Sequence, residues 1–146
     1  MARSLTLMGV LLTWLAAGAA VVVEPFLETG TTAATEVEKP DLARALANTE
    51  PLPNDTDLNR LTVAALKQSK DGDFLTATAW YIAILKLYPQ NAILYFDLGN
   101  CYQKLAKEYK EAKPLAKESY QKAMELRPDL WEAGLNLAVI LLLTII

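Results

Sequence analysis

The sequence has no histidine and a single cysteine, Cys101, among its 146 residues. Without histidine there is no Ser-His-Asp or Cys-His catalytic arrangement, no histidine-ligated metal and no imidazole that titrates near neutral pH. One cysteine cannot form an internal disulfide or a cysteine-rich zinc or iron–sulfur site. The 14 basic and 17 acidic residues leave a net charge of −3, which argues against a protein built mainly to bind nucleic acid. The sequence therefore predicts no enzyme: no catalytic residues, no cofactor, no metal and no small-molecule substrate.

The hydrophobic share of 53% is slightly above the ~45–50% norm, and the excess lies at the two ends of the chain. Residues 5–23 carry no charge, and as a helix they would be about 28 Å long, close to the ~30 Å hydrocarbon core of a bilayer. They predict a single transmembrane helix after a cytoplasmic N-terminus at 1–4, with the remaining chain on the periplasmic or lumenal side. The alternative is a signal peptide cleaved near Ala19, which would leave an exported soluble protein.

Small residues recur along this apolar segment. Gly9, Thr13 and Ala17 are four positions apart and share one helix face. Such a stripe lets a second membrane helix approach closely, although small residues are also common in signals and membrane helices in general.

Residues 24–57 are predicted to form a flexible acidic linker. Eight acidic and two basic residues give this segment a net charge of −6. Within it, Asp41 is placed to cap a short helix that puts Leu42, Ala45 and Leu46 on one side. So short a helix is not stable alone, and the whole segment is expected to act as a tether.

Residues 58–130 contain two apolar helical pairs with matching residues. Ala77, Tyr81 and Pro89 correspond to Ala116, Tyr120 and Pro128, in both cases with spacings of four and eight. The prolines are expected to end the second helix of each pair, and Asn91 or Asp129 to cap the helix that follows. Small residues at Gly99, Ala116 and Ala123 would let two antiparallel helices approach closely, while Tyr95, Leu98, Tyr102, Tyr120 and Met124 fill the space around them.

This pattern closely resembles the tetratricopeptide repeat family. Residues 71–74, Asp-Gly-Asp-Phe, are similar to the family's tight turn, and residues 98–102 and 120–128 are near its consensus. The resemblance implies an all-α fold, a short α-solenoid of antiparallel helix–turn–helix repeats. Repeat 1 would cover 58–91, repeat 2 would cover 92–130, and 131–146 would be an apolar helix that opens an incomplete third repeat. It also implies that Cys101 is an inert core residue; a redox role or palmitoylation of this cysteine is the alternative.

The second repeat departs from the family in length. Pro89 and Pro128 are 39 positions apart rather than 34, and the five extra residues fall between Leu105 and Ala116. We interpret them as a lengthened first helix and a longer turn, with Pro114 at the start of the second helix.

The resemblance also implies a concave surface, formed by the first helix of each pair, that binds peptides or partner helices. Carried over by position, this partner groove would be lined by Asn59, Thr62, Leu66, Ser69, Lys70, Ile93, Phe96, Asn100, Gln103 and Lys104. The family's clamp for a C-terminal carboxylate needs a basic residue and an asparagine where Thr62 and Leu66 stand, so that clamp is not expected. Leu66 and Phe96 favour an apolar or extended ligand. The alternative is that this surface packs against the linker or the last helix.

Five lysines between positions 104 and 117 look like a basic patch, but Glu108, Glu111 and Glu118 interleave with them at helical spacings, as on a solvated face. Residues 58–130 nonetheless carry 11 basic and 8 acidic residues. A weak attraction to the acidic linker or to anionic lipid is the alternative interpretation.

Residues 135–146 contain only two polar side chains, Asn136 and Thr144. One face of this helix can cover the second repeat, but a helix that is apolar all round must bury its other face as well. The candidate docking residues are Trp131, Leu135, Leu137, Ile140 and Leu141. The partner would be a membrane protein, the lipid boundary, a second copy, or further sequence of a longer chain.

These features predict a membrane-anchored, non-enzymatic scaffold or assembly factor that binds protein partners, with membrane-complex subunits as the expected class. The alternative is a small structural subunit of a large membrane complex, for example photosynthetic or respiratory, with both apolar ends buried in it. A third hypothesis is the regulatory or substrate-presenting arm of an enzyme encoded further along the chain.

Overall fold

The computed structural model of the chain describes residues 40–146. Three predictions lie outside the described residues: the helix at 5–23, its packing face at Gly9, Thr13 and Ala17, and the first part of the linker. Across residues 40–146 the protein is all-α, with six helices and no strand. No helix in this range is long and apolar enough to cross a membrane.

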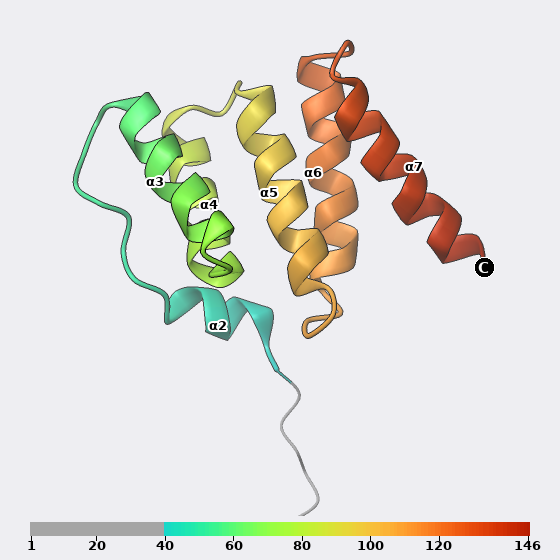
Figure 1. Ribbon diagram of the computed structural model, residues 1–146, viewed down its shortest axis with the longest axis horizontal. Helices are drawn as coiled ribbons and strands as arrows, with labels where there is room; N and C mark the ends of the chain where they lie inside the picture. The colour runs from blue at the N-terminus through green and yellow to red at the C-terminus, as the bar shows by residue number, and fades with distance from the viewer. Residues whose placement is uncertain (1–39) are drawn as a thin grey trace, which may run out of the picture. The chain divides into compact units, whose positions relative to one another are not determined.

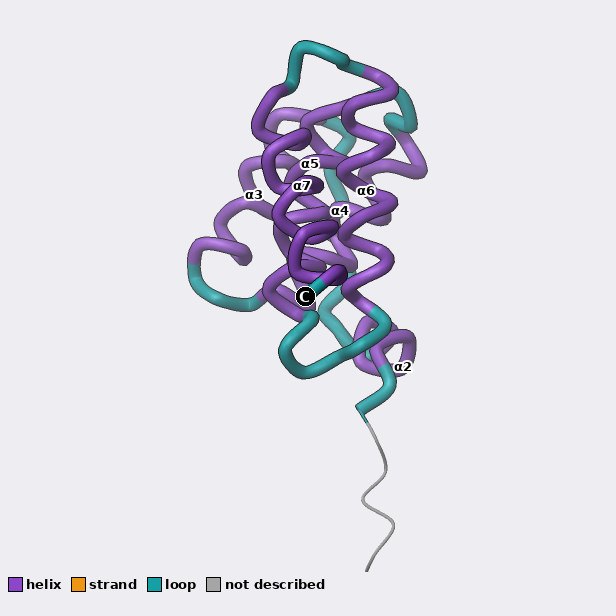
Figure 2. The backbone as a smooth tube through the Cα atoms, turned by 90° about the vertical axis from the view of Figure 1, so that its right-hand side faces the viewer, coloured by secondary structure: helices purple, strands orange, loops and turns teal. Residues whose placement is uncertain are grey.

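The six helices follow one another along the chain as α2 (Leu42–Ala47), α3 (Leu58–Lys70), α4 (Phe74–Leu87), α5 (Ala92–Leu105), α6 (Ala112–Leu126) and α7 (Trp131–Ile145). Helices α3 and α4 form one antiparallel hairpin and α5 and α6 a second; α4 packs on α5, and α7 packs on α6 (Figure 1). The short helix α2 lies at one end of this stack, where it contacts α4 (Figure 2).

Turn and cap residues define the first hairpin as the sequence predicts. Gly72 has a φ of +89°, a left-handed conformation that favours glycine, and the Asp73 side chain accepts a hydrogen bond from the backbone of Thr76 at 3.0 Å. Asn91 caps α5 by accepting from Ile93 and Leu94.

The ends of the second helices confirm the expected role of the prolines, whereas one predicted cap is wrong. Helix α4 ends two residues before Pro89 and α6 two residues before Pro128. Asp129 does not cap α7: its carboxylate lies 3.6 Å from the Arg127 guanidinium, and the helix begins without a side-chain cap. Helix α7 begins at Trp131 with Leu130 in the capping position, so Asp129 lies one residue before the position from which Asp57 and Asn91 cap their helices.

The two helices of the second hairpin approach closely at Gly99. A Cβ added there would lie 2.7 Å from Cε1 of Tyr120, inside contact distance. Ala116 and Ala123 face the same interface and are fully buried, as is Tyr120. The close approach predicted from these small residues is therefore confirmed.

The extra length of the second hairpin lies mostly in its turn. Six residues, 106–111, separate α5 from α6, where three separate α3 from α4; α5 and α6 are each one residue longer than their counterparts. Pro114 is the third residue of α6, in the first turn, where its missing N–H costs no hydrogen bond. Tyr109 is buried, so the longer turn is packed against the hairpin.

The flexible linker predicted for 24–57 is wrong for residues 40–57, which pack against the first hairpin. The predicted short helix is confirmed as α2: Asp41 caps it, and Leu42 is buried. Beyond it, the indole N–H of Trp80 donates to the carbonyl of Glu50 at 2.8 Å. Aromatic side chains with a polar tip thus bind this segment to α4, which composition and charge alone did not indicate.

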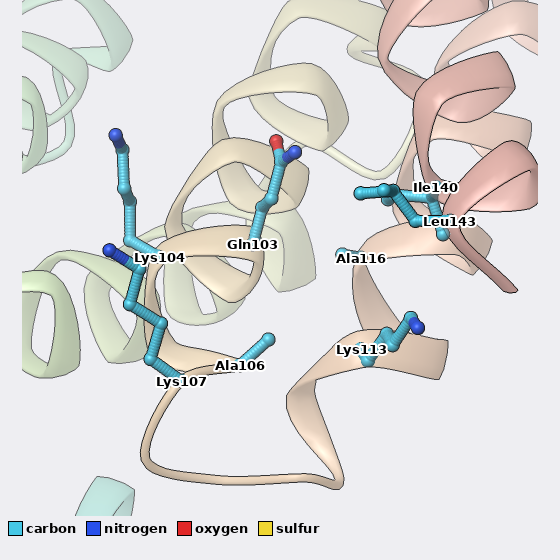
Figure 3. A pocket seen from close by; sticks show the side chains of 8 residues that line it. All are labelled: Gln103, Lys104, Ala106, Lys107, Lys113, Ala116, Ile140 and Leu143. Atoms are coloured by element: carbon cyan, nitrogen blue, oxygen red, sulfur yellow. The ribbon is translucent and has the colours of Figure 1, made fainter. Parts of the chain in front are cut away.

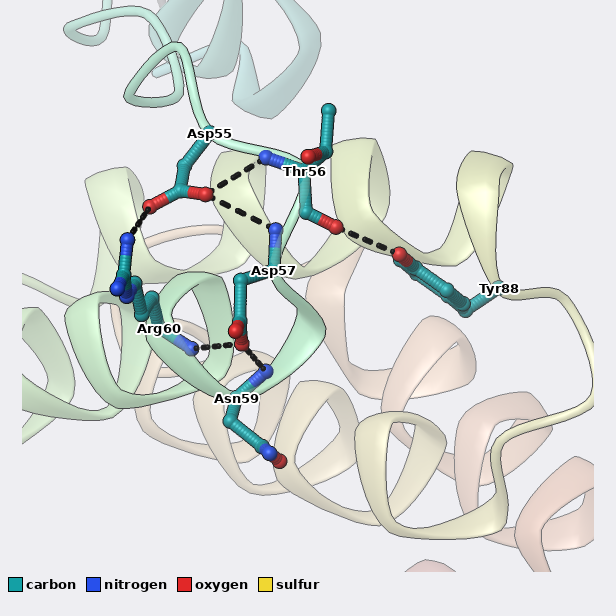
Figure 4. A network of polar contacts seen from close by, with 6 residues as sticks. All are labelled: Asp55, Thr56, Asp57, Asn59, Arg60 and Tyr88. Carbon is teal, nitrogen blue, oxygen red and sulfur yellow. Dashed lines mark hydrogen bonds and ion pairs between the residues drawn. The ribbon is translucent and has the colours of Figure 1, made fainter.

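A compact polar network joins the segment to both helices of the first hairpin (Figure 4). The Asp55 carboxylate accepts from the backbone of Thr56 and Asp57 and lies 3.7 Å from Arg60. The backbone hydrogen bond from Asp57 is the main reason that the Asp55 pKa is lowered. Asp57 caps α3, and Tyr88 donates to the Thr56 carbonyl at 2.9 Å.

Candidate functional site

The ten predicted groove residues lie on the first helices α3 and α5, and half of them remain at the surface. The exposed ones are Asn59, Leu66, Lys70, Ile93 and Lys104. The two apolar members, Leu66 and Ile93, are 37% and 38% exposed; Leu66 lies in the second half of α3 and Ile93 in the first turn of α5. They form a candidate binding surface, which we call the α3/α5 surface.

The other five groove residues are engaged within the fold. Thr62 and Phe96 are half-buried, and the Phe96 ring packs on that of Tyr120 with centroids 6.0 Å apart. Ser69 accepts a weak hydrogen bond from the Cys101 thiol at 3.8 Å. Asn100 and Gln103 belong to a polar cluster with α6 and α7.

This polar cluster, the Tyr120 cluster, consists of Asn100, Gln103, Tyr120 and Asn136. The Tyr120 hydroxyl donates toward Asn100 Oδ1 at 2.8 Å and Gln103 Oε1 at 2.9 Å. The Asn136 amide donates to Asn100 Oδ1 at 3.0 Å and to the Tyr120 oxygen at 3.3 Å. Burial is the main cause that raises the pKa of Tyr120 to about 12. The cluster joins three helices and occupies the amide oxygens of the groove.

The equivalent tyrosine of the first hairpin has no such partners. Tyr81 is fully buried, and no group within residues 40–146 bonds to its hydroxyl. The residue 16 positions after Tyr120 is Asn136, and the residue 16 positions after Tyr81 is Asp97. Leu66 stands where the second hairpin has Asn100. The first hairpin therefore has a carboxylate and an aliphatic side chain where the second has two amides.

Asp97 is the polar residue that sequence reasoning missed. It is half-buried, and desolvation raises its pKa from 3.8 to about 6. Burial also raises the pKa of Tyr81, and the charge of Asp97 adds to that effect. The 16-residue spacing was visible in the sequence, but only the contacts of Asn136 show that the position faces the tyrosine.

Cys101 is free and only 1% exposed. Burial raises the pKa of its thiol to about 11, so the reactive thiolate is scarce at neutral pH. This environment agrees with the expectation of an inert core cysteine.

The five candidate docking residues of the last helix divide between two faces. Ile140 is buried and Leu137 packs against the core, so both attach α7 to the preceding hairpin. Trp131, Leu135 and Leu141 point outward and are 68%, 55% and 40% exposed. The outer face of α7 is thus apolar and uncovered within the described part of the chain.

Two cavities flank the C-terminal half of α7. The first, of about 370 Å³, has an apolar floor and three lysines around it (Figure 3). Its lining residues are Gln103, Lys104, Ala106, Lys107, Lys113, Ala116, Ile140 and Leu143. The second, of about 240 Å³, lies between α6 and α7 and is lined by Lys113, Pro114, Lys117, Ile140, Leu141 and Thr144. Neither cavity has an acidic residue in its lining.

No protein-family model matches the chain, and no curated protein matches its sequence. The similarity to tetratricopeptide repeats accordingly remains a matter of residue spacing. Among residues 40–146, no three histidine, cysteine, aspartate or glutamate side chains gather where they could hold a metal ion.

Proposed function

We propose that the protein is a membrane-anchored, non-enzymatic scaffold with tetratricopeptide-like repeats that bind another protein. The uncharged run at 5–23 supports the anchor, and the repeated spacing of residues 58–130 supports the repeats. The two successive antiparallel hairpins agree with this interpretation.

The observation that carries the proposal is the α3/α5 surface. Leu66 on α3 and Ile93 on α5 are large apolar side chains left at the surface of two neighbouring helices. Asn59, Lys70 and Lys104 are the exposed polar residues among the groove positions of the same two helices. Exposed apolar side chains together with polar ones are typical of a protein interface. The partner would supply an apolar or extended segment.

Affinity capture of the full chain in mild detergent tests this assignment. We expect the double variant Leu66→Asp, Ile93→Asp to lose a partner that the unmodified chain retains, because it replaces both exposed apolar side chains of this surface with charges. Val63→Asp is the matched control, since Val63 is also an apolar residue of α3 and is 65% exposed but lies outside the groove positions. Equal loss in the control, or retention of every partner by the double variant, would contradict the assignment.

The anchor is tested separately by extraction of membranes at high pH. We expect the full-length chain to stay with the lipid, and a chain that lacks residues 5–23 to be released. Release of the full-length chain with the soluble proteins would contradict the anchor and leave the α3/α5 surface untouched.

The uncovered outer face of α7 favours a second candidate, a small structural subunit of a membrane complex. In that case the chain would co-migrate with a stoichiometric complex on native gels. Migration of the chain as a free monomer would count against it.

A further inference from the structure

The last two turns of α7 expose apolar side chains in nearly all directions. Leu141, Leu142, Leu143 and Ile145 are 40%, 59%, 60% and 83% exposed. Successive residues of a helix point about 100° apart, so three consecutive exposed leucines cannot all share one face. A groove in a protein covers one side of such a helix, whereas lipid surrounds it.

Lysines stand on both sides of these two turns. Lys104 comes from the end of α5, Lys107 from the α5–α6 turn, and Lys113 and Lys117 from the beginning of α6. The two cavities that contain them are also lined by Ile140, and each includes a leucine of α7. Glu108, Glu111 and Glu118 belong to the same end of the hairpin but line neither of these cavities. The linings of these two cavities are therefore cationic, while Glu108 lines a neighbouring cavity with Lys104 and Lys107.

We infer that this end of the protein is a membrane-binding site: the last two turns of α7 insert into the boundary between headgroups and acyl chains of an anionic leaflet. The four lysines would meet the lipid phosphates, with their aliphatic stems along the apolar surface. Insertion of this kind needs no spanning helix, in agreement with the length of α7. The site is independent of the anchor at 5–23, and the inference does not rest on the proposed scaffold function.

Charge also decides between lipid and a second copy of the chain. A symmetric dimer through the ends of α7 would bring the same surface of each copy together. It would then place four lysines of one copy close to four of the other, with no acidic residue in the cavity linings to offset them. An anionic lipid surface instead supplies the opposite charge and the apolar medium together.

The experiment places a fluorescent label on the site in the full chain. The variant Leu142→Cys is labelled with an environment-sensitive dye, while buried Cys101 is checked for labelling in the unmodified chain. Labelled protein is reconstituted with vesicles of phosphatidylcholine, with or without phosphatidylglycerol, whose acyl chains carry bromine as a quencher. We expect at least about twofold quenching with the anionic vesicles, reversed toward the aqueous value by about 0.5 M salt.

Matched variants separate this site from the anchor. A label at Val63→Cys on α3 should stay unquenched in every vesicle. The double variant Lys113→Glu, Lys117→Glu should abolish quenching at position 142, whereas Lys67→Glu, Lys86→Glu changes the net charge equally and should leave it. Flotation of the chain with vesicles of phosphatidylcholine alone reports the anchor, because the lysines meet no anionic lipid there; its loss would contradict the proposed anchor without affecting the quenching result in anionic vesicles.

Three outcomes would overturn the inference. The label at position 142 could remain aqueous in anionic vesicles. It could be quenched equally in neutral vesicles, which would remove the role of the lysines. The emission of the label could also report an apolar environment that grows with protein concentration and is not quenched by brominated lipid. This result would assign the surface to a second copy.

Discussion

Replacement of Asp97 by asparagine is expected to stabilise the protein at neutral pH. The Asp97 carboxylate is half-buried beside Tyr81, and no group in residues 40–146 bonds to it or pairs with it. Desolvation raises its pKa from 3.8 to about 6, so the folded state disfavours the charged form. An amide of the same shape removes that charge. At the equivalent position of the second hairpin, Asn136 donates to the hydroxyl of Tyr120.

The size of the effect follows from the pKa difference. At 1.36 kcal/mol for each pKa unit, the rise from 3.8 to about 6 corresponds to about 3 kcal/mol of lost stability once the group is ionised in both states. The folded state holds the proton of Asp97 more tightly than the unfolded state. The contribution of this carboxyl to stability is therefore fully present below pH 3.8 and is lost as the pH rises through about 6. Because the side chain keeps some contact with water, we expect Asp97→Asn to raise the free energy of unfolding by about 2 kcal/mol at pH 7.5.

Urea unfolding of the full chain in mild detergent, followed by circular dichroism, measures this gain. The gain should shrink to within about 0.5 kcal/mol of zero near pH 4, where the unmodified carboxyl is protonated in the folded state. Glu108→Gln is the control, because it makes the same chemical change at an exposed residue of the α5–α6 turn. No gain at pH 7.5, or an equal gain at both pH values, would refute the argument from desolvation.

Two further predictions each compare a pair of residues of the same type, measured by thermal unfolding. Tyr120→Phe should lower the free energy of unfolding by about 1–2 kcal/mol, because it removes a hydroxyl that bonds to two amides. Tyr81→Phe should be neutral or stabilising, because that hydroxyl has no partner within residues 40–146. Equal losses in the two variants would contradict the assigned contacts. Gly99→Ala should cost about 1–3 kcal/mol, since its Cβ would lie 2.7 Å from the Tyr120 ring. Gly134→Ala, whose Cβ would lie 3.4 Å from the flexible end of Met124, should instead be tolerated and gain up to about 1 kcal/mol of helix propensity; a large loss there would contradict the packing.

Local signals in the sequence predicted most of the helical architecture. Pro89 and Pro128 ended helices because the residue before a proline avoids the helical region, and Asn91 and Asp41 capped helices because their side chains reach free amides. These effects act over a few residues and depend little on the rest of the fold. Asp129 failed as a cap because α7 begins at Trp131, which puts Leu130 rather than Asp129 in the capping position.

What could not be predicted depends on contacts between distant residues. The segment after Pro40 reads as a linker by composition, yet the indole of Trp80 reaches the carbonyl of Glu50, 30 positions away. The groove positions were placed on the correct helices, but the engagement of Asn100 by Asn136 required α7 to be in place. Likewise, the position of Asp97 beside Tyr81 could be recognised only from the hydrogen bond that Asn136 makes to Tyr120 at the equivalent position.

The Tyr120 cluster has a consequence for the position of α7 along its own axis. Contacts between aliphatic side chains select the face of a helix but define its height weakly, because a shift of one turn, about 5.4 Å, exchanges one aliphatic residue for another. Asn136 removes this freedom, since any such shift would separate its amide from Asn100 and Tyr120 and leave polar groups unpaired. The apolar end of α7 therefore projects by the same length in every molecule, and whatever surface it meets will meet the same leucines.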